Sequence, residues 1–205
     1  WGDTTGSGLH MHMSMLDGEK QNIFSGLNGS PSPAMRHAIA GLLTYMPDAM
    51  LIFAPHLNSY RRFVPGYIAP TEALWGLDHR AAAIRVPEAV GPSARFEHRV
   101  AGSDANPYLA LAAAVGAGLW GIENKVEPDA AVEGNAYDKK FPKRLNLPRS
   151  LMDAAGNGQD HAVEVLLAAG ANPTLRDIDD MTAADFALDQ GHTELQERLF
   201  EAETV

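Results

Sequence analysis

Residues 94–113 read ARFEHRVAGSDANPYLALAA and hold the signals of a strand, a turn and a helix in one stretch. The first part, 94–100, favours a β-strand, in which side chains two residues apart share a face. Glu97 and Arg99 therefore point to the same side, where they form either part of a binding site or a structural ion pair. A second β-rich run at 81–86, separated from the first by a proline and glycine turn, predicts a neighbouring strand.

The second part of the stretch predicts a helix. Asp104 or Asn106 can cap its N-terminus, and Pro107 suits a position in the first turn. The run 108–122 is uncharged and rich in alanine and glycine. We therefore expect this helix to be largely buried in the protein, since its apolar run falls short of a membrane span.

Upstream segments supply another helix and a loop. The helix is expected to begin at the cap Ser32 and to be kinked or split by Pro47. Residues 58–70 contain two prolines and a glycine and predict a loop, which carries the adjacent residues Arg61 and Arg62. Guanidinium groups bind carboxylate or phosphate with two parallel hydrogen bonds. Solvated surface arginines are the alternative interpretation.

The N-terminal segment alternates between polar and apolar residues. Residues 5–15 read TGSGLHMHMSM, a glycine-rich turn that runs into a predicted strand. The period of two places His10, His12 and Ser14 on one face. Two imidazoles beside a glycine turn could bind a metal and a phosphate-bearing ligand. A half-exposed strand with a polar outer face explains the same pattern, so spacing alone leaves both interpretations open.

Charge divides the chain into two parts. Residues 1–150 hold 14 basic and 14 acidic side chains, whereas residues 151–205 hold 2 and 12 and account for the whole net charge of −10. So abrupt a change suggests two units of different origin. The acidic part argues against nucleic acid or an anionic membrane as its partner. The chain has no cysteine, and with no signal peptide or membrane span in the sequence, we expect a cytoplasmic protein.

The acidic part contains an internal repeat. Residues 151–158 align with 184–191 at an offset of 33, and Leu166 and Leu199 are separated by the same offset. A 33-residue period of paired short helices is typical of ankyrin repeats, and VLLAAGANP at 165–173 resembles that family. Fewer than two repeats are present, and a stack needs about three. We therefore expect this tail either to pack against the preceding part of the chain or to be loosely structured. We also expect it to offer a site for a protein partner.

Five motifs in the first part point to one known family. They are GSGLHMH at 6–12, NSYRRFVPGY at 58–67, HRAAAIRVP at 79–87, ARFEHRVAGSDANPYLALAA at 94–113 and GLWGI at 118–122. In order and length they resemble the glutamine synthetases and the related γ-glutamyl-amine ligases, over about residues 5–150. The resemblance implies the C-terminal part of a catalytic domain at 1–149, followed by the ankyrin-like tail at 150–205. The implied fold class is α+β: an incomplete, twisted, mainly antiparallel sheet packed by helices, followed by an all-α tail.

The chemistry that this resemblance implies is ATP-dependent ligation. In that family ATP phosphorylates the γ-carboxylate of glutamate, and ammonia or an amine then displaces the phosphate. The implied cofactors are ATP and Mg²⁺ or Mn²⁺, and the implied substrates are glutamate and an amine or ammonia. A ring-shaped homo-oligomer with active sites between adjacent subunits is also implied.

The resemblance assigns roles to single residues. His10 and Glu97 match the ligands of the metal that bridges the nucleotide phosphates, and a hard divalent cation prefers oxygen and tolerates imidazole. The other matched positions are His12 and Ser14 at the nucleotide, Arg62 at the glutamate carboxylate, Arg80 and Arg85 at phosphate, Arg99 near the acyl-phosphate, and Gly6 and Gly8 where the backbone approaches the substrate. Arg62, Arg80 and Arg99 are the predicted catalytic residues, because their charge stabilises the transferred oxygens.

Two departures from the family pattern bear on activity. Ile68 stands where glutamine synthetases carry a flap glutamate, and an aliphatic side chain neither binds a cation nor accepts a proton. We therefore expect the parent enzyme to join glutamate to an organic amine, with an ordinary, ammonia-using glutamine synthetase as the alternative. The family's other metal ligands would lie before Trp1, so we expect this chain alone to show no synthetase turnover. A non-catalytic binding or scaffold protein is the alternative from another class.

Overall fold

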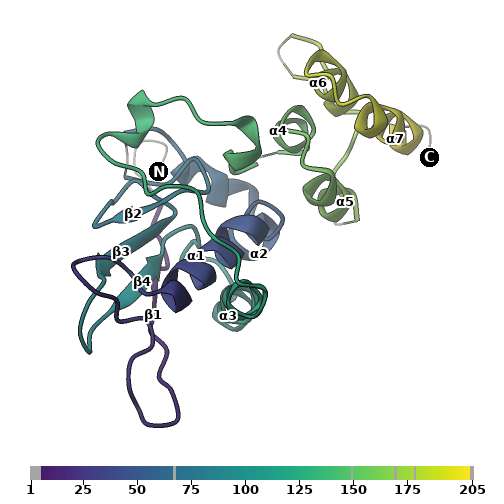
Figure 1. Cartoon of the computed structure of the whole chain (residues 1–205). Coiled ribbons are helices and arrows are strands. Elements are labelled where there is room, and N and C mark those ends of the chain that lie inside the picture. The colour runs from purple at the N-terminus through teal and green to yellow at the C-terminus, as the bar shows by residue number, and fades with distance from the viewer. Residues whose placement is uncertain (1–5, 67, 149, 169, 178, 204–205) are drawn as a thin grey trace. The chain divides into compact units, whose positions relative to one another are not determined.

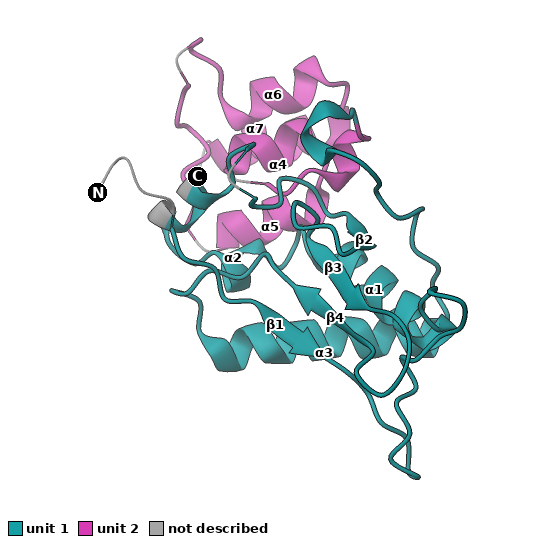
Figure 2. Cartoon of the chain, turned by 90° about the vertical axis from the view of Figure 1, so that its left-hand side faces the viewer, with its two compact units in different colours: residues 1–140 teal, residues 141–205 magenta. Residues whose placement is uncertain are grey.

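The computed structural model describes residues 6–66, 68–148, 150–168, 170–177 and 179–203 (Figure 1). The chain divides into two compact units, Trp1–Lys140 and Phe141–Val205 (Figure 2). The main elements of the first unit are β1 (Met11–Met13), α1 (Pro33–Tyr45), α2 (Met50–Phe53), β2 (Trp75–Leu77), β3 (Ile84–Glu88), β4 (Arg95–His98) and α3 (Pro107–Asn124). Short 3₁₀ turns lie at Leu57–Arg62 and Ala136–Asp138. This unit therefore mixes α and β structure.

The four strands form one sheet in the order β1-β4-β3-β2. β4 pairs antiparallel with β1 and with β3, whereas β2 and β3 are parallel. The sheet is thus mixed, with two of its three strand pairings antiparallel. The sequence did not reveal β2, because a strand of three residues is too short to show a period of two. β3 begins at Ile84, later than expected, because the preceding residues form a turn in which the Ala82 N–H donates to the His79 carbonyl at 3.2 Å.

The predicted helix caps are confirmed. The Ser32 side chain accepts a hydrogen bond from the Met35 N–H at 3.1 Å and begins α1. Pro47 lies between α1 and α2, so the predicted split occurs. Asn106 caps α3 by accepting from the N–H groups of its first turn. These local bonds satisfy donors that every helix N-terminus leaves open.

Helices α1 and α3 approach each other closely on one side of the sheet (Figure 1). The contact is made at glycines: a Cβ added to Gly41 would lie 2.1 Å from the Ala117 carbonyl oxygen. A Cβ added to Gly121 would lie 2.1 Å from the His37 carbonyl oxygen. Backbone therefore packs on backbone at this crossing, which requires glycine on both helices.

The expectation that α3 is largely buried was wrong. Only its small residues are buried, and they form the side that faces α1. Its larger apolar residues are exposed: Tyr108, Leu109, Leu111, Val115 and Leu119. An apolar sequence permits a helix to be buried on every face, but it does not determine which faces pack against the rest of the fold. Among the described residues, no helix is long and apolar enough to cross a membrane.

The second unit is helical. It consists of α4 (Leu151–Gly156), α5 (Asp160–Ala168), α6 (Ala183–Asp189) and α7 (Thr193–Glu203), preceded by a 3₁₀ turn at Lys143–Leu145. Its own core includes Val163, Leu195 and Leu199. Gly158 and Gly191 both have positive φ, of 66° and 83°, and each stands just before the second helix of a pair. The internal repeat of the sequence is thus repeated in the backbone.

Candidate active site

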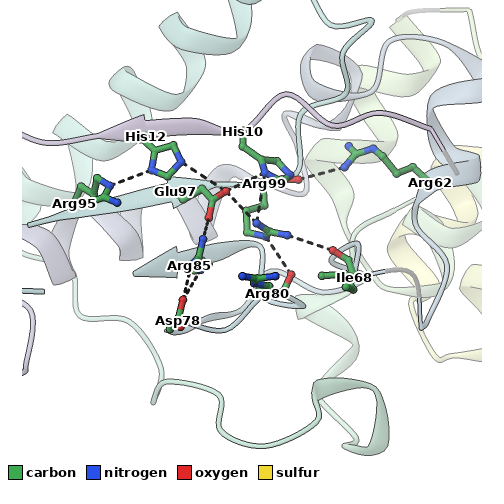
Figure 3. A network of polar contacts seen from close by, with 10 residues as sticks. All are labelled: His10, His12, Arg62, Ile68, Asp78, Arg80, Arg85, Arg95, Glu97 and Arg99. Carbon is green, nitrogen blue, oxygen red and sulfur yellow. Dashed lines mark hydrogen bonds and ion pairs between the residues drawn. The ribbon is translucent and has the colours of Figure 1, made fainter. Parts of the chain in front are cut away.

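A group of charged side chains lies along one face of the sheet (Figure 3). Along β4, Phe96 and His98 point into the core. The Phe96 ring lies 5.5 Å from that of Phe24, and the His98 ring lies 4.4 Å from that of Phe53. Because side chains alternate along a strand, Glu97 turns to the other face.

Strand register brings partners to Glu97 from both sides. His12 of β1 and Arg85 of β3 are its cross-strand neighbours. Arg85 Nη1 lies 2.8 Å from Glu97 Oε2, while Arg99 Nη1 and His10 Nδ1 lie 3.0 and 2.9 Å from Oε1 (Figure 3). His12 Nε2 is 3.8 Å from the same oxygen. These five residues are called the Glu97 cluster below.

The Glu97 carboxylate is ionised although it is only 3% exposed. Burial alone would raise its pKa, because a low-dielectric surrounding disfavours charge. The hydrogen bond from Arg85 and the positive charge of Arg99 outweigh burial, so the pKa of Glu97 is lowered. Both of its oxygens are engaged, and the site thus holds an anion between two cations.

The pair His10 and Glu97 is a partial donor set for a divalent cation. Burial and the charge of Arg99 lower the pKa of His10, which favours the neutral imidazole that ligates metals. Among the described residues no group of three or more His, Cys, Asp or Glu is arranged to hold a metal. Mg²⁺ usually keeps several waters and binds through one or two carboxylates plus substrate phosphates. The two residues fit such a site as its protein ligands.

The tautomer of His12 is set by Arg95. Arg95 Nε donates to His12 Nδ1 at 3.3 Å, so Nδ1 is the acceptor and the proton is assigned to Nε2. That N–H faces Glu97 (Figure 3). Arg95 thereby orients the second imidazole of the cluster.

Arg99 links the cluster to the loop that carries Ile68. Its Nε donates to the Arg80 carbonyl at 3.1 Å, and its Nη2 donates to the Ile68 carbonyl at 3.4 Å. The Ile68 residue is 53% exposed. The backbone of Ile68 thus contacts a buried guanidinium while its aliphatic side chain is exposed.

Arg62 borders the cluster through the backbone. Its Nη1 donates to the Arg99 carbonyl at 3.3 Å and its Nη2 donates to the Val100 carbonyl. Burial lowers the pKa of Arg62. A Cβ on Gly8 would come within 3.0 Å of His10 Nε2 and 3.4 Å of Arg62 Nη1. Glycine at this position therefore lets the N-terminal segment approach both side chains.

Most of the site residues inferred from the sequence come together. Those in mutual contact are His10, His12, Arg85, Glu97 and Arg99, with Arg62 adjoining. Arg80 contributes its carbonyl. Gly6 would place a Cβ 3.9 Å from Arg62 Cβ. Ser14 is exposed beyond β1, and within the described part of the chain no hydrogen bond joins it to the cluster.

Two residues of the site were not assigned from the sequence. Asp78 accepts from Arg85 Nε at 2.8 Å; no local pattern marks it, because the turn before β3 brings it back to Arg85. Arg95 could have been found, since it shares the face of Glu97 at a spacing of two. Both add to the charge balance around Arg85 and Glu97.

Comparison with known proteins identifies the family. A family model described as the catalytic domain of glutamine synthetase matches residues 1–169. The chain belongs to the glutamine synthetase family. The match includes the whole Glu97 cluster and extends through α4 and α5, where the sequence had suggested an ankyrin-like segment.

Relatives within the family differ in their named products. The chain is 42% identical over 142 residues to gamma-glutamylputrescine synthetase PuuA of Escherichia coli K12, covering 68% of this chain and 30% of that protein. It is 43% identical over 155 residues to gamma-glutamylethanolamide synthetase GlnA4 of Streptomyces coelicolor, covering 76% and 32%. It is 46% identical over 142 residues to the glutamine synthetase of Pyrococcus abyssi, covering 69% and 32%. The chain thus spans about a third of the length of these relatives.

Proposed function

We propose that this chain is part of an ATP-dependent ligase that activates the γ-carboxylate of glutamate as an acyl-phosphate and transfers it to an organic amine. The observation that carries the proposal is the Glu97 cluster. One buried carboxylate and one half-exposed imidazole meet at 2.9 Å, and two guanidiniums flank the carboxylate. Such positioned charges stabilise anionic oxygens during phosphoryl and acyl transfer.

Each residue has a role in this proposal. His10 and Glu97 would hold Mg²⁺ or Mn²⁺, which neutralises phosphate charge when bound. Arg85 and Arg80 would bind phosphate oxygens, Arg99 would stabilise the acyl-phosphate, and Arg62 would bind the glutamate carboxylate. His12 and Ser14 would contact the nucleotide. Gly6 and Gly8 leave room for the substrate backbone.

The acceptor is proposed to be an organic amine because of Ile68. The Ile68 backbone carbonyl contacts Arg99, and the aliphatic side chain is exposed. That side chain could cover the carbon chain of an amine, but it cannot bind ammonium or accept its proton. Names of two relatives, a glutamylputrescine and a glutamylethanolamide synthetase, are consistent with this choice. Glutamine synthetases of similar identity keep ammonia as the competing acceptor.

Binding and turnover test the proposal in separate steps. Calorimetric titration with Mn²⁺ and then with ATP should show binding to the wild type, and Glu97→Gln should abolish the Mn²⁺ heat. This chain alone is expected to show no turnover, so glutamate-dependent release of phosphate is compared for ammonia, ethanolamine and a diamine in the full-length parent enzyme. Preference for ammonia would contradict the amine acceptor. Absence of both metal and nucleotide binding would contradict the ligase and favour a scaffold protein.

We also propose that the second unit is an ankyrin-type repeat that contacts a protein partner. Its support is the offset of 33 residues that separates the glycines Gly158 and Gly191 and the starts of α5 and α7. The Thr182 and Asp185 capping box at the start of α6 is a further feature of a regular helical repeat. A ring-shaped homo-oligomer is proposed for the parent enzyme. Light scattering coupled to size exclusion tests the oligomer.

A further inference from the structure

A segment following α3 runs along the edge strand β2 of the first unit (Figure 1). This segment, residues 129–137, is called the strap. The Val132 N–H donates to the Trp75 carbonyl at 2.8 Å, and the Gly134 carbonyl lies 2.6 Å from His79 Nε2. The strap is therefore bonded to the sheet edge and to the turn that precedes β3.

The strap ends in a hydrogen bond to the loop that carries Ile68. Tyr137 Oη donates to the Ala69 carbonyl at 2.9 Å. Tyr137 is itself held in place, because its N–H donates to Asn135 Oδ1 at 3.2 Å and Asn135 Nδ2 donates to Asp138 Oδ2 at 2.8 Å. A fixed tyrosine thus donates to a buried carbonyl, for Ala69 is 4% exposed.

The residue before Ala69 has an unfavourable backbone conformation. Ile68 has φ of +57°, and a β-branched side chain in this left-handed region is a genuine outlier. Such conformations persist only where surrounding contacts impose them, and they gather at functional sites. Two contacts do so at this loop: Arg99 bonds to the Ile68 carbonyl and Tyr137 bonds to the next carbonyl.

We propose that Tyr137 is a positioning residue that holds the Ile68 backbone against Arg99 of the Glu97 cluster. One of the two bonds is donated by Arg99 of the Glu97 cluster. In the proposed function, Arg99 also binds the anionic substrate. When Arg99 turns to a ligand, the bond from Tyr137 is the one that keeps the loop in place. The consequence for substrate rests on the proposed function: Tyr137 sets how well the apolar part of an amine acceptor is covered.

Hydrogen exchange of the free chain tests the positioning role without any ligase activity. Tyr137→Phe removes one hydroxyl and one hydrogen bond. Amides in the peptide containing residues 68–72 should then exchange about two- to twelve-fold faster, which is the equilibrium change for one hydrogen bond. Tyr108→Phe, at an exposed site on α3, is the matched control and should leave this peptide unchanged. Unchanged exchange in Tyr137→Phe would overturn the proposal.

A second variant separates positioning from general loss of structure. Glycine adopts a positive φ without steric cost, so Ile68→Gly should make the loop less dependent on Tyr137. The effect of Tyr137→Phe on exchange should shrink in the Ile68→Gly background, and an equal effect in both backgrounds would contradict the mechanism. Where the protein turns over, the KM for the amine should rise in Tyr137→Phe and the KM for glutamate should not; a parallel rise in both would also contradict it. This chain alone is expected to show no turnover, so the exchange result decides the role of Tyr137, and metal and nucleotide binding decide the ligase proposal separately.

Discussion

Glu97 is the residue on which the site depends. Its carboxylate is buried and holds two guanidiniums and an imidazole within hydrogen-bonding distance. Burying such charges costs free energy unless each is paired, and the loss of one partner leaves the others uncompensated. The same contacts that form the site therefore also stabilise the sheet.

Glu97→Gln should lower the free energy of unfolding by about 3 kcal/mol, because Arg85 and Arg99 lose their counter-charge in a buried setting. Urea unfolding followed by tryptophan fluorescence measures this change, since the three tryptophans lie in the first unit. The matched control is Glu127→Gln, which also removes a carboxylate paired with an arginine, Arg36, but at the surface. That variant should change stability little. Equal losses in the two would show that burial of the Glu97 pair is unimportant.

His98 makes the first unit sensitive to acid. Its ring is fully buried, and neither ring nitrogen has a hydrogen-bond partner among the residues that the structure describes. Burial, aided by the charge of Arg62, lowers the pKa of His98 to about 3, against about 6.5 in the unfolded chain. Below pH 6.5 the unfolded state binds a proton that the folded state cannot bind, so stability falls as the pH falls towards 3.

Between pH 7 and pH 5 this one residue should cost about 2 kcal/mol of stability. His98→Phe keeps a ring against Phe53 and removes the titration, so its unfolding free energy should fall less over the same interval. The measurement is a urea curve at each pH. A slope identical to that of the wild type would refute the assignment.

Part of the site follows from local sequence pattern. Strand alternation correctly placed Glu97 and Arg99 on one side, and it correctly placed His10 and His12 on the same side of the N-terminal segment. The register that sets His12 beside Glu97 is a long-range property that spacing does not contain. The hydrogen bond from Tyr137 to the Ala69 carbonyl joins residues 68 positions apart. Neither a tyrosine nor an alanine in the sequence predicts such a partner.

At the scale of elements, the crossing of α1 and α3 shows how glycine can be required or unfavourable within one helix. Gly121 lies in the contact, where a Cβ would meet the His37 carbonyl, whereas a Cβ on Gly116 would meet nothing within 4 Å. In an open helix position glycine is disfavoured by backbone entropy. The two positions in α3 should therefore respond in opposite directions to the same substitution.

Gly121→Ala should destabilise the first unit by about 1–3 kcal/mol, because the helices must move apart to admit a methyl group. Gly116→Ala should stabilise it by about 0.5–1 kcal/mol. Thermal unfolding followed by tryptophan fluorescence compares them. A loss in both variants would mean that glycine is needed for some property of α3 other than close packing.

The elements themselves were predictable to different degrees. The caps Ser32 and Asn106 were found because a cap is a local signal of a few residues. The strand β2 was missed because it is short and its identity depends on pairing with β3. The burial of α3 was overestimated because its apolar composition permits burial but does not determine which other elements pack against the helix.

At the scale of the whole molecule, each unit has a core of its own. The core of the second unit includes Leu199, which is fully buried between the helices α4 to α7. The change in charge near residue 150 predicts two units. The boundary between the two compact units lies earlier in the sequence, between Lys140 and Phe141. The boundary at 149/150 stays a prediction.

Leu199→Ala should cost the second unit about 2–5 kcal/mol through the cavity it leaves. If the units unfold separately, exchange in α6 and α7 should accelerate while that in α1 and α3 stays as in the wild type. Hydrogen exchange measured by mass spectrometry resolves the two. Equal acceleration in both units would show one cooperative transition instead.

The exposed stripe on α3 has a consequence for how molecules behave in solution. The exposed residues Leu111, Val115 and Leu119 lie in a region, residues 1–150, that carries no net charge. Electrostatic repulsion between two molecules is therefore weak at this surface. The ten excess acidic groups after residue 150 provide that repulsion for the whole chain. Salt screens such forces within about 10 Å at 0.1 M. The acidic tail thus limits aggregation of the protein. High salt should weaken the repulsion between tails and promote aggregation through the exposed apolar residues of α3.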